Sequence, residues 1–497
     1  MSDIKICLFN PIDVPTYPPL NLTYLSAYLK KYGKYRYEIR MVDINSTKDP
    51  IGAIISFSPH ILGITSLSSH IVEIYEMSNK IRALNKDILQ VFGGAHATVN
   101  PDEPLKRAGF DIAVIGEGEV TFTELVDSYI ENGRRLTVDS LSSINGIAFK
   151  HENNIRVNPS RLLISDIDAI PHPDRELLNN DFYNKRYFIY RGMSTNGVAT
   201  IAASRGCPFK CIFCCVNFVA RSEVRFHSAE YVTHEMEEMI SKYKIKWLFF
   251  TDDTFMVNKS KTRELCEMMI EKGLNKKVKW EVQVRSNLVR HDDLPLLQLM
   301  KKAGCEQIDY GFESGNPRVL TLIKGKGITV EDHQRAIDIT NQAGIKVMGT
   351  FILGTPTETY EEMLDTRAFV IKNYDKIYRF QVGCMIPYPG TPVYELCIEK
   401  GLISNDYYGE LKKEKDEHAE HGMRIYSDIV PAPKVIELRK ELDMLALKKI
   451  TFSEKLQWLT YNMFNSPKTV VVGVKWFFSR ITDSYNKNKS YEVKNLN

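Results

Sequence analysis

Short apolar runs alternate with stretches of helical periodicity along the first quarter of the chain. The helical stretches place apolar side chains three and four positions apart, as in Leu22, Leu25 and Leu29, and the apolar runs are rich in β-formers. The five expected strands are Ile4–Phe9, Tyr37–Val42, Ile61–Thr65, Leu89–Phe92 and Ile112–Ile115. Five such units predict a doubly wound parallel sheet in a domain of residues 1–135, with a ligand crevice beyond the carboxyl ends of the strands.

A polar turn then separates two further strand-like runs. Ile144–Lys150 and Asn154–Asn158 read as a hairpin, and Asp166–Arg191 follows as a connector that contains proline and aromatic residues. We therefore treat residues 136–192 as a hairpin and linker between two larger units.

A second alternation of strands and helices fills residues 193–400. The expected strands are Thr200–Ala203, Trp247–Thr251, Val278–Val284, Gln307–Phe312, Lys346–Phe351 and Phe380–Met385. Gly304 and Gly344 stand where helices end, and Thr329 with Asp332 has the spacing of a capping box. Six such units predict a (β/α)6 partial barrel, whose functional residues would gather at the carboxyl ends of the strands.

The pattern weakens in residues 401–497, which we expect to form a helical, basic extension. Val435–Trp458 has helical periodicity, and residues 431–497 hold 12 Lys or Arg against 6 Asp or Glu. Val470–Phe478 adds an apolar cluster that contains Trp476. Such a tail could rest on an anionic membrane surface, but the pattern favours a helical lid packed on the barrel.

Composition narrows the class of protein. With 43% hydrophobic and 26% charged residues and a net charge of +3, the chain is typical of a soluble globular protein and does not call for nucleic acid. We find no secretory signal at Met1 and no apolar run of the roughly 18 residues needed to cross a bilayer. The nine irregularly spaced cysteines favour metal binding or free thiols over disulfides, and thus a reducing cytoplasm.

Three of these cysteines follow the first strand of the predicted barrel. Cys207, Cys211 and Cys214 form a Cys-x3-Cys-x2-Cys loop, which can ligate three irons of a cluster and leave one iron open to a small molecule. The alternative is a zinc site completed by Cys215 or His227, or a set of buried thiols. Cys215 is better explained as a packed thiol than as a fourth ligand.

The loop and the segments after it, about Thr200 to Thr391, resemble the radical S-adenosylmethionine (SAM) superfamily. Phe213 matches the aromatic position before the third cysteine. The resemblance implies a [4Fe-4S] cluster whose open iron binds SAM and cleaves it to a 5′-deoxyadenosyl radical. It also implies SAM-binding roles for the strand-end residues Asp252, Asp253, Arg285 and Glu313. The family's Gly-Gly-Glu after the second strand is absent, which weakens the assignment of the two aspartates.

The N-terminal domain, about residues 4–130, resembles the Rossmann-like cobalamin-binding domain that precedes the radical domain in one large subgroup. The matching segments are Pro18–Leu25, Gly93–His96 and Gly116–Glu119 with Thr121-Phe122. The resemblance implies cobalamin contacts from Gly93, Gly94, His96, Gly116, Glu117 and Gly118.

Glycines at strand ends let the backbone approach a large flat ligand closely. The chain lacks the Asp-x-His-x-x-Gly signature that supplies a histidine to cobalt, so a protein ligand below cobalt is not expected. Whether His70 or His96 approaches the corrin stays open. The alternative is a nucleotide-binding or ligand-free module.

The leading hypothesis is a cobalamin-dependent radical methyltransferase that acts on a weakly activated carbon through the 5′-deoxyadenosyl radical and methylcobalamin. An oxidative cyclase or ring-rearranging enzyme with the same cofactors is the second hypothesis, and a non-catalytic corrinoid or cluster-binding protein is the third. The methylthiotransferases are excluded because the N-terminal region contains only Cys7. Expected partners are a small-molecule substrate, whose identity the sequence does not reveal, and an electron donor such as flavodoxin or ferredoxin.

Overall fold

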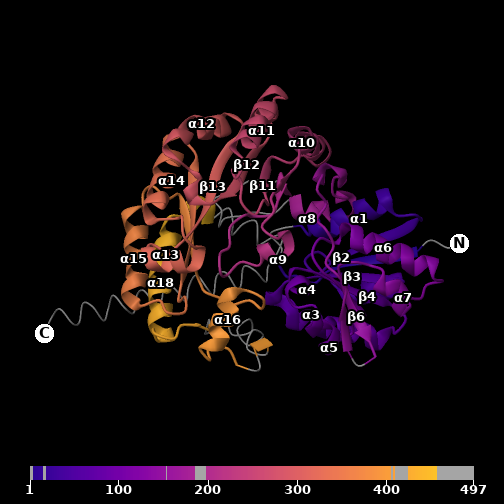
Figure 1. Cartoon of the computed structure of the whole chain (residues 1–497). Helices are drawn as coiled ribbons and strands as arrows, with labels where there is room; N and C mark the ends of the chain where they lie inside the picture. The colour runs from indigo at the N-terminus through magenta and orange to yellow at the C-terminus, as the bar shows by residue number, and fades with distance from the viewer. Residues whose placement is uncertain are drawn as a thin grey trace.

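Two α/β units lie side by side in a computed structural model of the chain. The structure describes residues 4–14, 18–152, 154–184, 197–404, 407–408 and 424–455. In Figure 1 the N-terminal unit is indigo to purple, and the larger unit that follows runs from magenta to orange. The short helix α9 (Val216–Ala220) lies between them.

The N-terminal unit is built on a seven-stranded sheet with the order β2-β1-β3-β4-β5-β6-β7. Its strands are β1 Ile4–Asn10, β2 Tyr37–Asp43, β3 Ile61–Ser66, β4 Leu89–Gly94, β5 Ile112–Val114, β6 Ile147–His151 and β7 Asn154–Val157. The first five strands pair in parallel, as predicted. The hairpin β6–β7 continues the same sheet by antiparallel pairing with β5, so it is structurally part of the N-terminal unit.

Each face of this sheet is covered by helices because side chains alternate along every strand. In β1, Ile6 and Leu8 pack under α1 and α6, whereas Cys7 and Phe9 pack under α2 and α3. The helices are α1 Leu20–Tyr32, α2 Pro50–Phe57, α3 Ile71–Leu84, α4 Ala95–Val99, α5 Asp102–Arg107, α6 Gly118–Glu131 and α7 Val138–Ser142. The strand order reverses between β1 and β3, and a crevice opens at such a reversal.

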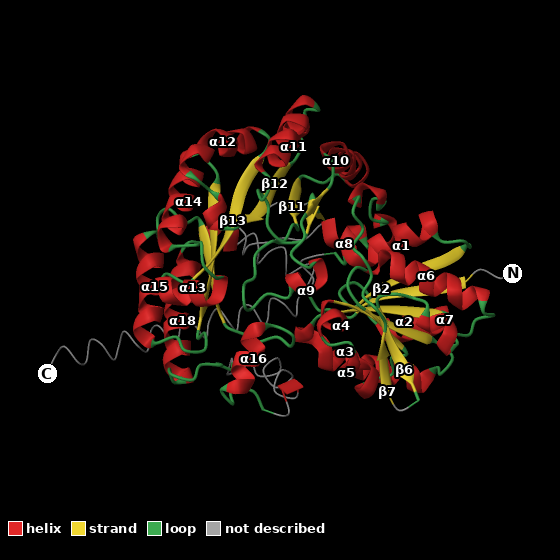
Figure 2. Ribbon diagram, viewed as in Figure 1, coloured by secondary structure: helices red, strands yellow, loops and turns green. Residues whose placement is uncertain are grey.

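Six parallel strands form the second unit, in the order β8-β11-β12-β13-β14-β15. The strands are β8 Val198–Ile201, β11 Trp247–Phe250, β12 Lys279–Val284, β13 Cys305–Glu313, β14 Lys346–Leu353 and β15 Arg379–Cys384. The outer helices are α10 Ala229–Tyr243, α11 Lys259–Glu271, α12 Leu294–Lys302, α13 Pro317–Lys324, α14 Val330–Gln342, α15 Tyr360–Lys372 and α16 Pro392–Glu399. The helices lie outside the curved yellow strands in Figure 2, which confirms the predicted partial barrel.

The barrel core is held by apolar side chains around Trp280, which is fully buried and donates its indole N–H to the Ala303 carbonyl at 2.9 Å. The predicted capping box at the start of α14 is present: Thr329 Oγ1 accepts from the Asp332 N–H, and the Thr329 N–H donates to the Asp332 carboxylate at 2.8 Å.

The described part of the connector contacts both units. Arg175, in a short 3-10 helix Arg175–Leu177, forms a buried ion pair with Glu235 of α10 at 2.6 Å. The neighbouring Asp174 accepts a hydrogen bond from Ser26 of α1 at 2.7 Å. The connector is therefore attached to both units.

The C-terminal extension contains α18 (Ala432–Lys448), three residues longer at its start than the sequence predicted. Val435, Leu438 and Leu442 of this helix are buried against the barrel. The predicted helix Val435–Trp458 is not continuous: α18 ends at Lys448, and helical structure resumes at Phe452. Trp458 and the apolar cluster Val470–Phe478 lie outside the described residues. Among the residues that are described, no helix is long and apolar enough to cross a membrane.

Candidate functional site

A short antiparallel strand pair forms the base of the cysteine loop. β9 (Ser204–Arg205) pairs with β10 (Arg225–Phe226), so residues 206–224 leave and return at one point. Gly206 has φ +96°, and a Cβ atom there would lie 2.0 Å from the Glu223 carbonyl oxygen. Only glycine fits this position, which directs the chain into the loop.

The three cysteines are partly exposed free thiols within this loop. The Phe209 N–H hydrogen-bonds Cys207, and the Arg285 guanidinium donates to Cys211 Sγ at 3.2 Å. Burial raises the pKa of the Cys214 thiol to about 12, so the free thiol is neutral at physiological pH. Metal binding would have to displace its proton, and the N–H donors would then stabilise the sulfur charge.

The arrangement differs from a site for one ion. Over the described part of the chain, no three His, Cys, Asp or Glu side chains converge closely enough to hold a metal ion. Three thiolates on a cluster bind three different irons and stand further apart than ligands that share one ion. The Cys207, Cys211 and Cys214 set is compatible with a cluster, and the assignment of the three thiols as its ligands stays a prediction.

Two aspartates at the end of β11 anchor the start of the loop. Asp252 is buried; one of its oxygens accepts from the Ala203 N–H at 3.0 Å and the other accepts from the Ser204 hydroxyl. Asp253 accepts from the Gly206 N–H at 3.0 Å. Burial raises the pKa of Asp252 to about 6. In this structure both carboxylates hold the loop backbone.

Arg285, after β12, connects the cysteine loop to the barrel. Its guanidinium stacks on the Phe209 ring at 4.2 Å and donates to the Lys324 carbonyl at 2.9 Å, besides its contact with Cys211. The side chain is thus fixed beside the thiols, where a planar cation can also receive a carboxylate.

Glu313 ends β13 in an unusual conformation. Its φ is +64°, and the β13–β14 register shifts between Gly311 and Glu313. A bulge re-aims a strand-end side chain, and a left-handed non-glycine residue costs about 1–3 kcal/mol. Its carboxylate accepts from buried Lys324 at 3.2 Å, which compensates the charge.

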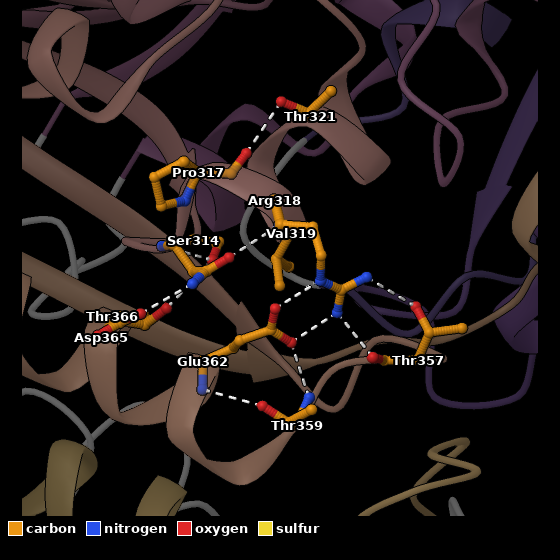
Figure 3. Close-up of polar contacts among 11 residues, drawn as sticks. Ser314, Pro317, Arg318, Val319, Thr321, Thr357, Thr359, Glu362, Asp365 and Thr366 are labelled. Carbon is orange, nitrogen blue, oxygen red and sulfur yellow. Dashed lines mark hydrogen bonds and ion pairs between the residues drawn. The ribbon is translucent and has the colours of Figure 1, made fainter.

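A polar network outside the barrel supports the turn after Glu313, as Figure 3 shows. The Gly315 N–H donates to the Thr366 hydroxyl at 2.9 Å. Arg318 of α13 forms a two-point ion pair with Glu362 of α15, and Glu362 also caps its helix with Thr359. The turn is thereby tied to α15 on its outer side.

A cavity of about 580 Å³ opens at the carboxyl ends of the N-terminal strands. Gly93, Gly94, Gly116, Glu117 and Gly118, the expected cobalamin contacts other than His96, line it. A Cβ at Gly116 would meet no atom within 4 Å, and one at Gly93 would meet only Val114 at 4.0 Å. The bare backbone leaves room that a bulky flat ligand can use, and this fits cobalamin.

The opposite wall of this cavity belongs to the second unit. Gly206, Cys215, Val216, Thr251 and Asp253 contribute to it, from the cysteine loop, the start of α9 and the end of β11. Cys215 is thus at the boundary between the cysteine loop and the crevice, a position that its sequence neighbours did not reveal.

The histidines that the sequence singled out lie elsewhere. His96 is absent from the described cavity lining; it is fully buried, and its Nδ1 is 2.9 Å from the Ser68 hydroxyl. Its Nε2 is 3.5 Å from the Glu103 carboxylate. His70 is also buried, with its Nδ1 2.8 Å from the Ser69 hydroxyl, and is not a lining residue.

Comparisons with known proteins agree with this division. Residues 14–126 match the B12 binding domain and residues 201–370 match the radical SAM superfamily. An uncharacterized methyltransferase of Pyrococcus horikoshii is 33% identical over 395 residues, which cover 78% of this chain and 80% of that protein.

Two further proteins are similar over most of the chain. The anaerobic magnesium-protoporphyrin IX monomethyl ester cyclase of Cereibacter sphaeroides is 28% identical over 76% of this chain and 60% of its own length. The radical SAM methyltransferase TsrM of Kitasatospora setae, solved with cobalamin and a [4Fe-4S] cluster, has the same fold. Its TM-score is 0.64 at 20% identity, covering 80% of this chain and 78% of that one.

Proposed function

Because the chain belongs to the radical SAM enzymes that carry an N-terminal B12-binding domain, we propose that it methylates a weakly activated carbon of a small molecule. Its cofactors are a [4Fe-4S] cluster, SAM and cobalamin. Bound together, they supply a 5′-deoxyadenosyl radical and a transferable methyl group.

The shared cavity is the observation that supports the proposal most. One wall of the cavity is the glycine-lined end of the N-terminal sheet. The other wall includes Cys215, which follows the third cysteine of the loop, and Asp253. A methyl carrier and a radical generator that act on one substrate carbon must open into one space. The orientation of the two units suits that requirement.

Individual residues have proposed roles in this chemistry. Cys207, Cys211 and Cys214 would hold the cluster, and Arg285 would hold a carboxylate of the ligand on the open iron. Glu313, aimed by its bulge, would accept hydrogen bonds from a ribose. Asp252 and Asp253 would position the loop through the Ala203, Ser204 and Gly206 contacts rather than bind the ligand directly.

Two proposals concern partners. Reduction of the cluster needs an external one-electron donor such as flavodoxin or ferredoxin, since the cysteines outside the loop are buried thiols. The second is peripheral membrane contact through the basic tail, residues 431–497, most of which lies outside the described residues.

An oxidative cyclase is the second candidate, favoured by the 28% identity to the Cereibacter sphaeroides protein. A cyclase would use the same cofactors, so only the reaction product distinguishes the two candidate functions. We would purify the protein without oxygen, quantify its iron and cobalamin, and supply SAM labelled in its methyl group with candidate substrates. The methyltransferase proposal expects a labelled product together with 5′-deoxyadenosine. An unmethylated product lighter by two hydrogens would favour the cyclase.

A non-catalytic corrinoid or cluster-binding protein predicts a different result. It would form no 5′-deoxyadenosine, even with a strong reductant and full iron content. The assembled set of thiols, Arg285 and Glu313 argues against it.

A further inference from the structure

Four charged side chains connect the two units beside the cavity. Arg225 makes a two-point contact with Glu117, at 2.5 and 3.0 Å. Arg205 lies 2.8 Å from Glu119 and 3.5 Å from Glu117. We refer to Glu117, Glu119, Arg205 and Arg225 as the interdomain clamp.

The clamp is desolvated and balanced in charge. The side chain of Arg225 is 4% exposed, and those of Glu119 and Glu117 are 7% and 12% exposed. Burial alone would raise the pKa of Glu117, but hydrogen bonding and charge from the two arginines lower it overall, so this carboxylate stays ionised. In a partly buried site, removing one member leaves an uncompensated charge, which costs more than losing a surface ion pair.

The two arginines face each other across a strand pair. Arg225 of β10 is the direct cross-strand partner of Arg205 of β9. Like charges at directly opposite positions repel and destabilise such a pair. The only described carboxylates in ion-pair contact with them are Glu117 and Glu119, which come from the other unit. The base of the cysteine loop therefore depends on the N-terminal unit for its electrostatic stability.

Three members of the clamp, Glu117, Glu119 and Arg205, also line the cavity themselves. Arg205 directly precedes Gly206 and is two positions from Cys207. Glu117 stands between Gly116 and Gly118, which line the cavity. A displacement of the Glu117 carboxylate would move the floor of the crevice and the base of the cysteine loop together.

We propose that the interdomain clamp is a positioning device that fixes the cysteine loop relative to the corrinoid crevice and so sets the separation of the two cofactors. The inference uses the proposed cysteine ligands only for the separation between cofactors; the stabilisation of the strand pair is independent of them.

The first test needs no cofactor. Hydrogen–deuterium exchange would be measured on the full chain as Glu117→Gln, Glu117→Gln/Arg225→Gln and Glu124→Gln. Glu124 is the control, because it lies on α6, the helix that Glu117 directly precedes, and pairs with Arg161 instead of the clamp. We expect at least tenfold faster exchange of the β9 and β10 amides in Glu117→Gln. The double variant should be closer to the wild type, because it removes one charge of each sign and keeps the Arg205–Glu119 pair.

The second test measures position directly. With both cofactors loaded and reduced, pulsed electron paramagnetic resonance reports the dipolar coupling between the cluster and cob(II)alamin. The clamp predicts a shifted or broadened coupling in Glu117→Gln, an unchanged one in Glu124→Gln and partial recovery in the double variant. Should Glu117→Gln lose iron, the double variant should retain more of it.

Wild-type exchange rates in Glu117→Gln, or an unaltered coupling with both cofactors present, would overturn the inference. A wild-type protein that binds no iron would contradict the cysteine assignment alone, because the exchange experiment still decides whether the clamp stabilises the strand pair.

Discussion

The two walls of the cavity are built from different parts of the polypeptide. The barrel side is formed in part by Gly206, Cys215 and Asp253, and it adjoins functional side chains: the three thiols of the cysteine loop and the Arg285 guanidinium, which donates to Cys211. The N-terminal side presents mostly backbone, at Gly93, Gly94 and Gly116. On the first side a substitution removes a chemical group, whereas on the second side it adds an obstacle. Substitutions in the two walls should therefore impair cofactor binding in different ways.

The largest effect is expected from the thiols. Cys207→Ala, Cys211→Ala or Cys214→Ala should each lower the iron content after anaerobic reconstitution to background and abolish formation of 5′-deoxyadenosine. The reason is that two remaining thiolates do not hold the cluster. Iron analysis and product chromatography measure both. Cys215→Ala is the neighbouring control and should keep its iron. Full iron content in any of the three variants would contradict the ligand assignment.

Substitutions at two glycines of the other wall should distinguish steric hindrance of the ligand from strain in the backbone. Gly93→Val should lower hydroxocobalamin affinity at least tenfold with little change in melting temperature, since the added side chain enters open space. Gly94→Ala should instead destabilise the protein by about 2–3 kcal/mol, because a left-handed backbone and a backbone clash add up. At Gly94 φ is +96° and a Cβ would lie 2.8 Å from the Ser66 backbone.

Absorbance titration and thermal melting distinguish the two glycine variants. Equal losses of affinity and stability in both would show that the glycines serve folding only.

Substitutions of Glu313 should separate the loss of SAM binding from the relief of backbone strain. Glu313→Gln should weaken SAM binding about 10- to 100-fold, since a hydrogen bond to a charged group contributes about 1.5–3 kcal/mol. Glu313→Gly should weaken it as much but melt at a higher temperature than Glu313→Gln, because both variants lose the charge partner of Lys324 and only glycine relieves the strain of φ +64°. Glu306→Gln, on the same strand but paired with Lys301 and Lys279, is the control. Equilibrium dialysis with labelled SAM gives the affinities.

The smallest effect on ligand binding is expected at Glu358, where the pH dependence of folding should change instead. Glu358 is fully buried before α15; its carboxylate accepts from the Thr355 N–H, and burial raises its pKa to about 8. The folded state then binds this proton more tightly than the unfolded state, so stability falls as pH rises from about 4.5 to 8. The loss should amount to a few kcal/mol.

Glu358→Gln cannot ionise, and it should remove this part of the pH dependence. Its melting temperature should match the wild type near pH 5 and exceed it by several degrees at pH 9. If the melting temperatures of the two proteins differed by the same amount at pH 5 and at pH 9, the raised pKa of Glu358 would be contradicted.

The strands could be predicted because buried parallel strands leave short apolar runs between amphipathic helices. All five N-terminal strands and all six barrel strands appear close to the expected positions. The joining of the hairpin to β5 could not be inferred, because edge pairing depends on long-range contacts that leave no local pattern. The break in the predicted helix Val435–Trp458 after Lys448 could not be inferred either, because the apolar periodicity continues across it.

The site was predictable where chemistry fixes a spacing. The cysteine loop and the glycines at strand ends belong to that class. The clamp was not, because Glu117 and Arg225 are 108 residues apart and their pairing leaves no local pattern in the sequence. His96 shows the converse: a histidine beside two glycines resembles a ligand, yet its ring packs inside the domain, 6.2 Å from Phe92.

Helix α9 has a consequence for the order in which the enzyme matures. It begins two residues after Cys214, contacts α4, and gives Val216, Val219 and Ala220 to the cavity wall. A helix of five residues does not persist alone in water, so it needs a folded cysteine loop in front of it. Iron–sulfur assembly should therefore precede stable corrinoid retention, and exposure to oxygen should release vitamin B12 as the cluster decays.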